Sequence, residues 1–286
     1  METVYECHGH MMMDGISYAA AARAHRARPD EAAVRRHLEG LRAAGVTYFR
    51  DGGDPFGVWR AARALAPAYG VEYATPCFAI HRNGRYGGIV GRGYDTIADF
   101  RALIADLRAL GADFVKIMFS GIVTFRAFGE LSCAPLDAAE MRELVHIAHG
   151  EGFAVMVHCN GAEAVRGALA AGVDSVEHGN FMDAEAVAAL AESGAVWVPT
   201  AAALQAMRGR EGFDQDVVAE TVRAQLANVR RAAEAGARIA VGSDAGAVGV
   251  PHGPGARTER EMLLPYCPGG VLDEGCREIR RRFRRG

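Results

Sequence analysis

The stretch FAVMVHCNGAEAVRGALAAGVDSVEHG, residues 153–179, contains two apolar runs separated by a segment with helical composition. The first run, 153–159, is almost continuously apolar, which is typical of a strand that is covered on both faces. Residues 161–171 are rich in alanine and leucine, and Gly172 follows, where glycine accepts the left-handed conformation that ends a helix. The second run, 173–179, begins directly afterwards. The stretch therefore predicts a strand, a crossover helix and a second, parallel strand.

The same order of elements repeats along the whole chain. Further strands are predicted at 3–8, 46–51, 71–80, 113–119, 195–200 and 238–244. Further helices are predicted at 30–44, 56–69, 96–110, 137–150, 183–193 and near 214–235. Glycines end four of these helices just before the next strand, at Gly45, Gly111, Gly194 and Gly236. About eight such repeats favour an α/β protein with a closed (β/α)8 barrel, the TIM barrel, over an open sheet.

The length and composition suit one globular unit. The chain has 286 residues, of which 50% are hydrophobic and 23% charged, and no linker or change of composition divides it. We therefore predict a single TIM-barrel domain over 1–286, with C-terminal helices at about 257–286 that pack on the barrel. The net charge of −3 gives no reason to expect nucleic acid or a membrane as a partner. The basic end, REIRRRFRRG at 277–286, is typical of the last turns of a helix, where cations complement the helix dipole.

Cysteine usage and hydropathy bear on the compartment. The six cysteines are scattered, form no CxxC motif and follow no signal peptide, and no apolar run is long enough to span a bilayer. These features predict a reduced, cytoplasmic protein. The sequence does not determine the oligomeric state, and a homo-oligomer is compatible with it. The glycine-rich stretch 81–95 does not match a phosphate-binding spacing, and we expect it to form a mobile loop over a site.

Ionisable residues gather at the carboxyl ends of the predicted strands, where TIM barrels carry their active sites. His8 and His10 are two residues apart, so they share one face of a strand. The complete set is His8, His10, Lys116, His158, His178 and Asp244. Side chains of this kind in one concave mouth would be costly to bury without partners, and metal coordination removes that cost. The set therefore predicts a metal site.

This ordered set resembles that of the amidohydrolase superfamily with a two-metal centre. The phrases KIMFSG at 116–121, VEHG at 176–179 and GSDAG at 242–246 are similar to its imidazolonepropionase-like and prolidase-like branch. The resemblance runs from His8 to about His252. Many members also carry a flanking β-sandwich, which we do not expect here because the first strand begins almost at the start of the sequence.

The resemblance implies two divalent metal ions bridged by Lys116 after its carbamylation. The family pattern assigns His8, His10 and Asp244 to one metal and His158 and His178 to the other. A hydroxide between the metals would attack a carbonyl, and Asp244 would accept its proton and pass it to the leaving group. Nitrogen and oxygen ligands accept several metals; we expect zinc, although manganese, cobalt and iron are also compatible.

The implied activity is hydrolysis of an amide or peptide-like C–N bond in a small molecule, such as a dipeptide or an N-acyl amino acid. A cyclic amidase or lactonase is compatible, because the same hydroxide attacks any carbonyl. The ligand set also fits a metal-dependent lyase or decarboxylase on the same scaffold, or a non-catalytic metal-binding remnant. We expect substrate contacts from His252, and from His81, Arg82 and Arg85 in the glycine-rich stretch.

Overall fold

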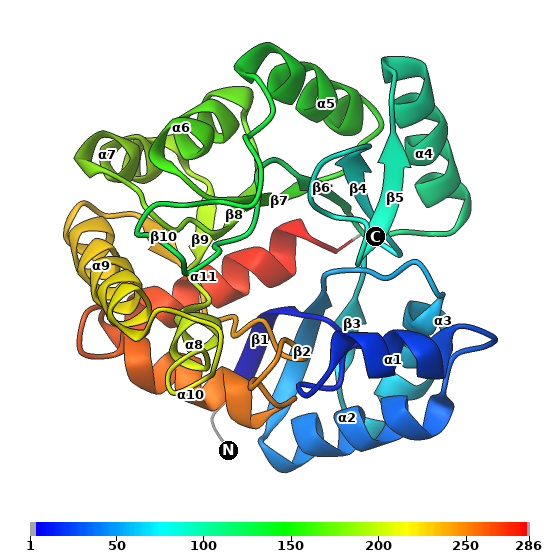
Figure 1. Ribbon diagram of the computed structural model, residues 1–286. Helices are drawn as coiled ribbons and strands as arrows, with labels where there is room; N and C mark the ends of the chain where they lie inside the picture. The colour runs from blue at the N-terminus through cyan, green and yellow to red at the C-terminus, as the bar shows by residue number, and fades with distance from the viewer. Residues whose placement is uncertain (1–3, 285–286) are drawn as a thin grey trace.

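The computed structural model describes residues 4–284, which form a ring of strands surrounded by helices (Figure 1). The strands are β1 (Val4–Gly9), β2 (Val46–Asp51), β3 (Glu72–Ala74), β4 (Ala79–Arg82), β5 (Gly91–Tyr94), β6 (Val115–Met118), β7 (Val155–Cys159), β8 (Ser175–His178), β9 (Val196–Val198) and β10 (Arg238–Ile239). The helices are α1 (Tyr18–His25), α2 (Glu31–Ala43), α3 (Val58–Leu65), α4 (Ile97–Ala109), α5 (Ala138–Gly150), α6 (Ala162–Ala171), α7 (Ala184–Ser193), α8 (Ala201–Gln205), α9 (Gln215–Glu234), α10 (Pro254–Leu263) and α11 (Gly269–Arg282). None of the described helices combines the length and the apolar character needed to cross a membrane.

The strands are parallel and close into a barrel. One sheet has the order β1-β2-β3 and the other the order β10-β9-β8-β7-β6-β4-β5. The residues after β10 complete the ring against β1, because the amide of Cys7 donates to the Val241 carbonyl (2.9 Å) and the amide of Asp244 to the His8 carbonyl (2.8 Å). The predicted α/β TIM-barrel fold is confirmed.

The third barrel strand is broken, where the sequence predicted one strand over 71–80. Its two parts are β3 and β4, and β4 pairs with β6. Pro76 lies in the gap and has no N–H to donate to a sheet. Cys77 follows with a φ of 63°, outside the strand region, and its amide donates to the Thr75 hydroxyl (3.0 Å). The sheet is thus interrupted where the chain turns towards the glycine-rich stretch.

Other differences lie at the edges of the predicted elements. Part of the glycine-rich stretch forms β5, which runs parallel to β4. The predicted strand 238–244 is a regular strand only over β10. Helix α1 was not predicted; it begins after Ser17, whose hydroxyl accepts from the Ala20 amide. Helices α10 and α11 correspond to the predicted C-terminal helices, whose last residues, 285–286, lie outside the described part, as does the first residue of the predicted strand 3–8.

Polar side chains begin most of the helices that flank the barrel. Asp30, Asp137, Asp183 and Asp214 precede α2, α5, α7 and α9, and the carboxylate of each accepts backbone N–H bonds of the first turn. Such caps satisfy donors that have no partner within the helix. The five glycines predicted to end helices all have positive φ, from 71° to 86°. Local signals in the sequence therefore set most of the helix boundaries.

Strand register places side chains of neighbouring strands at matched heights inside the barrel. Met118 of β6 pairs with His158 of β7, and His158 pairs with Glu177 of β8. Because side chains alternate between the two faces of a strand, these positions point to one side while Val157 and Val176 point to the other, towards the helices. Both valines are fully buried. The barrel thus has an apolar outer layer under the helices and a partly polar interior.

Helix α11 closes the amino-terminal end of the barrel and crosses the ring in Figure 1. A Cβ atom added to Gly275 would lie 2.1 Å from the carbonyl oxygen of Ile239 in β10, so helix and strand are in backbone contact. Phe283, just after the helix, packs edge-on against Phe114 (5.2 Å between ring centroids). Its ring also lies 4.4 Å from the guanidinium carbon of Arg50. The helix therefore excludes water from that end of the barrel interior.

We expect Gly275→Ala to lower the free energy of unfolding by about 1–3 kcal/mol, because overpacking forces backbone shifts. Gly270→Ala is the matched control in the same helix, since nothing lies within 4 Å of an added Cβ there. Alanine at that position should change stability by less than about 1 kcal/mol and in the stabilising direction. Urea unfolding of both variants measures the difference. Equal stability of the two would mean that α11 does not pack on β10 as described.

Candidate metal centre

Three of the predicted ligands converge at the junction between β1 and the residues after β10. The Nε2 atoms of His8 and His10 each lie 3.6 Å from Oδ1 of Asp244. The ligand atoms of these three residues all lie within 4.8 Å of one another. Both histidines are buried. This spacing leaves room for one cation between two imidazoles and a carboxylate, which is a common zinc ligand set.

The hydrogen bonding of these atoms fits a metal. Nε2 of His8 and Oδ1 of Asp244 are buried and have no hydrogen-bond partner among the described residues. Unpaired buried polar atoms are rare, because each costs about 1–3 kcal/mol. Here the two atoms face each other, and a cation between them would satisfy both.

The other three predicted ligands surround this group. Nζ of Lys116 lies 3.5 Å from Nε2 of His10. The ring centroid of His178 lies 4.9 Å from that of His8 and 4.6 Å from that of His158. The structure therefore brings all six residues together, although they come from β1 and the residue after it, from β6, β7 and β8, and from the segment after β10.

Hydrogen bonds set which nitrogen of two histidines carries the lone pair. Nδ1 of His8 lies 2.6 Å from a carboxylate oxygen of Glu177, and Nε2 of His158 lies 3.1 Å from the Gly121 carbonyl. A carboxylate and a carbonyl only accept, so we assign the proton to these nitrogens. The lone pair is then on Nε2 of His8, which faces Asp244, and on Nδ1 of His158.

Burial keeps the histidines neutral, the form that binds metals. Burial, with Lys116 as the next cause, lowers the pKa of His8 and His10 well below the usual value. Burial also lowers the pKa of His158 to about 4 and that of Lys116 to about 8. It raises the pKa of Asp244 to about 6. In every case desolvation of the charged form is the main cause.

Left-handed backbone positions the residues at three strand ends. His178, Thr200 and Asp244 have φ values of 67°, 50° and 62°, although none is glycine. Such conformations cost about 1–3 kcal/mol each and concentrate at functional sites. Along a regular strand Glu177 and His178 would point to opposite faces. The left-handed turn at His178 lets both side chains serve the cluster, and its Nδ1 lies 2.8 Å from the Thr200 hydroxyl.

A buried ion pair supports His8 from below. The guanidinium of Arg50 donates to both carboxylate oxygens of Glu177 (2.8 and 2.9 Å) and to the Ser175 hydroxyl (2.9 Å). Glu177 in turn accepts from His8. The side chains of Arg50, Glu177 and His8 are all fully buried. The sequence prediction missed Arg50 and Glu177; the available signal was a charged residue within each of two apolar strands.

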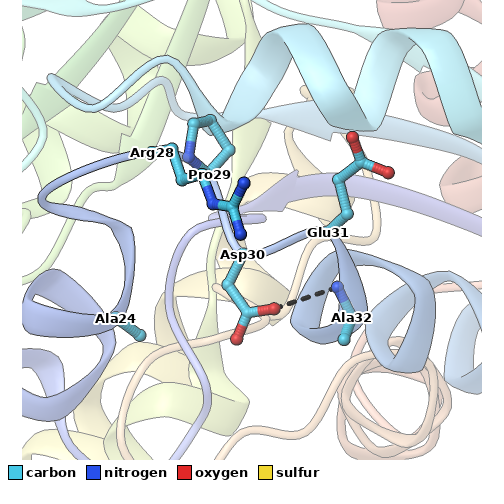
Figure 2. Close-up of a pocket in the computed structure, with 6 residues that line it drawn as sticks. All are labelled: Ala24, Arg28, Pro29, Asp30, Glu31 and Ala32. Carbon is cyan, nitrogen blue, oxygen red and sulfur yellow. Dashed lines mark hydrogen bonds between the residues drawn. The ribbon is translucent and has the colours of Figure 1, made fainter.

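A cavity of about 350 Å³ opens above the cluster. Five of the six predicted ligands line it, and His8 is fully buried. A second hollow of about 460 Å³ lies beside the loop between α1 and α2 (Figure 2). The second hollow is lined by Ala24, Arg28, Pro29, Asp30, Glu31 and Ala32. It shares no lining residue with the central cavity, and Asp30 there accepts from the Ala32 amide as a helix cap.

The four predicted substrate contacts do not line the central cavity. Arg82 pairs with Glu140 (2.5 Å), and Arg85 donates to the Ala134 carbonyl (2.9 Å). His252 stacks on His37, with ring centroids 4.0 Å apart, and the Nδ1 atom of His81 lies 3.1 Å from the Arg82 carbonyl. The glycine-rich stretch instead contributes Tyr86, Ile89 and Val90 to the cavity.

Comparisons with known proteins identify the fold and the family of this chain. An uncharacterized protein of Mycobacterium tuberculosis is 28% identical over 159 residues, which are 53% of this chain and 42% of that protein, so the match spans less than half of the curated relative. The structure of a Xaa-Pro dipeptidase with bound methionine has a TM-score of 0.77 at 24% identity, over 97% of this chain and 75% of that one. The structure of A. niger ochratoxinase has a TM-score of 0.76 at 19% identity, over 99% of this chain and 72% of that one. These structural likenesses show the shared fold. The family model named Amidohydrolase family matches residues 8–263, most of the sequence, and the chain therefore belongs to the amidohydrolase family.

Proposed function

We propose that this chain is a metal-dependent hydrolase that cleaves an amide or peptide-like C–N bond of a small molecule. The observation that carries the proposal is the facing pair of buried, unpartnered atoms, Nε2 of His8 and Oδ1 of Asp244, within a cluster that lines a cavity. Family membership supports the same chemistry. A dipeptide or an N-acyl amino acid is the proposed substrate, and the likeness to a Xaa-Pro dipeptidase supports it.

The proposed metal centre holds two divalent ions, with zinc as the first metal to test. His8, His10 and Asp244 would hold one ion and His158 and His178 the other. When bound, the ions would lower the pKa of a water molecule and polarise the substrate carbonyl. Asp244 would hold the proton that this water loses, because its Oδ1 faces the cluster without another partner.

Lys116 is proposed to join the two ions as a carbamate. An ammonium has no lone pair, whereas the neutral amine can form an N–C bond to carbon dioxide and lose a proton to give an anionic oxygen ligand. Lys116 is the only lysine of the sequence; all the other basic residues among the 32 Lys and Arg are arginines. An arginine guanidinium stays charged and cannot take this role. The one amine side chain thus lies 3.5 Å from a predicted ligand atom of His10.

We expect protein purified without chelator to contain about two equivalents of divalent metal per chain, as in two-metal hydrolases. Lys116→Ala and Lys116→Arg should both lose most of it, because neither side chain can become a carbamate. Elemental analysis measures the content. Protein equilibrated with carbon-13 bicarbonate should also give a carbamate carbon signal that both variants lack.

The metal content and the reaction products separate the candidate activities. One equivalent of metal in both the parent and the variants would indicate a mononuclear site and favour a lyase or another reaction class. A fully loaded protein that hydrolyses no amide, cyclic amide or lactone would contradict the hydrolase proposal. Carbon dioxide released from a carboxylic acid would then indicate a decarboxylase.

Glu177→Gln should weaken binding at the His8 ion by about 10–100-fold, as loss of a partner behind a ligating histidine typically does. It should also destabilise the fold by about 3–5 kcal/mol, because Arg50 stays buried without its counter-charge. Glu140→Gln is the control, since Glu140 pairs with the part-exposed Arg82 away from the cavity. That change should leave metal affinity unaltered. Zinc titration measures the metal affinity of each variant, after circular dichroism has shown that the variant is folded. Unchanged affinity in Glu177→Gln would contradict a role for Glu177 in orienting His8.

A further inference from the structure

One part of the cavity surface is built by the loop between β4 and β5 and by α1. The ring of Tyr86 lies 5.0 Å from that of His158, measured between centroids, so an aromatic face adjoins a predicted metal ligand. The Tyr18 hydroxyl donates to the Ile89 carbonyl (3.2 Å), which ties this loop to α1. All three of these loop and helix residues, Tyr86, Tyr18 and Ile89, line the cavity. This part is therefore largely apolar and held in place.

Another part comes from the loop between β6 and α5 and from the segment around α8. Phe125 and Phe213 meet edge to face, with centroids 5.5 Å apart. Val123 and Leu204 belong to the same apolar cluster, and all four line the cavity. The amide of Asp214, the cap of α9, donates to the Phe125 carbonyl (3.2 Å). The aromatic surface is thus preformed on the scaffold, as ligand pockets usually are.

Charge is almost absent from the cavity away from the cluster. Among the described residues that line it, Arg210 is the one charged side chain besides the predicted metal ligands. Nε of Arg210 donates to the Ala206 carbonyl (2.9 Å). Within the described part of the chain, Arg210 forms no ion pair with a carboxylate. Its terminal nitrogens therefore remain as donors at the edge of an apolar cavity.

We propose that the substrate is an amide with a bulky apolar acyl or side-chain group and a free carboxylate, which Arg210 binds. This inference rests on the proposed amide hydrolysis and specifies its substrate class. A charged acyl group would lose its hydration against Tyr86, Phe125 and Phe213 without gaining a partner. A carboxylate at Arg210 would gain a charge-assisted, fork-shaped hydrogen-bond partner.

Recognition of the carboxylate is tested with N-benzoyl-leucine and N-benzoyl-leucinol. The two compounds differ only in that the first carries a carboxylate where the second carries an alcohol. With the zinc-loaded enzyme, Arg210→Gln should lower kcat/KM for the acid about fivefold and leave that for the alcohol unchanged; the effect is modest because Arg210 is exposed and water screens its charge. The difference should shrink as salt is raised. Arg208→Gln is the matched control: Arg208 is exposed, two residues away, and does not line the cavity. Equal effects on acid and alcohol would overturn the assignment of Arg210.

The apolar group is tested at Ile122, which lines the cavity and is 44% exposed, so its replacement should not disturb the fold. Ile122→Asn should lower kcat/KM for N-benzoyl-leucine about fivefold and change that for N-acetyl-glycine little, because only the larger substrate covers this surface. Ile16→Asn is the control, since Ile16 is 79% exposed and lies outside the cavity lining. A preference of the parent enzyme for N-succinyl-glycine, with its charged acyl group, would overturn the proposal.

Calorimetric binding of the same compounds separates this inference from the proposed activity. One outcome is that N-benzoyl-leucine binds tightly, that Arg210→Gln weakens this binding and that the compound is not hydrolysed. The substrate-binding inference then holds and the proposed amide hydrolysis fails. If amides are hydrolysed but binding is indifferent to the benzoyl group and to Arg210, hydrolysis holds and the inference fails. Absence of both binding and turnover would contradict both.

Discussion

The hydrogen bonds between β1 and residues 241–245 hold the first and last strands of the barrel together, and the candidate metal centre depends on them. The amide of Asp244 donates to the His8 carbonyl (2.8 Å), and the amide of His10 donates to the Ala245 carbonyl (2.7 Å). These bonds place the Asp244 carboxylate between two imidazoles that precede it by more than two hundred residues. Because the three ligands meet only in the closed barrel, a metal bound by them would favour the closed, folded chain over the unfolded one.

The barrel interior below the cluster is organised around a buried charge pair. Arg50 and Glu177 lie on β2 and β8, and their ion pair is fully buried. Such a pair is expensive to desolvate and adds little net stability, so its value lies in what it orients. Here it fixes the Glu177 carboxylate against Nδ1 of His8. Phe283 covers the guanidinium from the other end. The C-terminal helix keeps water away from this ion pair. It therefore helps to fix the orientation of His8, which lies towards the opposite end of the barrel.

Elements with strong local signals could be predicted from the sequence. The apolar runs at 153–159 and 46–51 and the aspartate and glycine caps of the helices fix strands and helices within a few residues. The break of the third strand at Pro76 was not predicted, because apolar residues continue through it. Histidine, lysine and aspartate at strand ends identified the cluster, since parallel strands bring their carboxyl ends to one mouth.

The supporting residues of the site could not be predicted in the same way. Arg50 and Glu177 are 127 positions apart, and nothing local in either strand indicates the other. The left-handed backbone at His178 and Thr200 depends on the packing of neighbouring strands. Neither residue is glycine, so the sequence gives no local signal for this conformation. The residues predicted to contact substrate on the glycine-rich stretch illustrate the same limit. Arg82 and Arg85 are conspicuous in the sequence, yet they bind other parts of the protein, while Tyr86 beside them lines the cavity.

The pairing of a polar cluster with an apolar cavity has an electrostatic consequence. Interactions between charges strengthen as the surrounding dielectric falls, so apolar walls would increase the attraction between bound cations, the Asp244 carboxylate and a polarised carbonyl. The same walls make any further charge costly there, which fits a lining in which Arg210 is the one charge away from the cluster among the described residues. A buried amine suits this environment better than a guanidinium, because an amine can lose its charge and a guanidinium cannot. All the remaining residues among the 32 Lys and Arg are arginines, and the single lysine, Lys116, lies in the cluster.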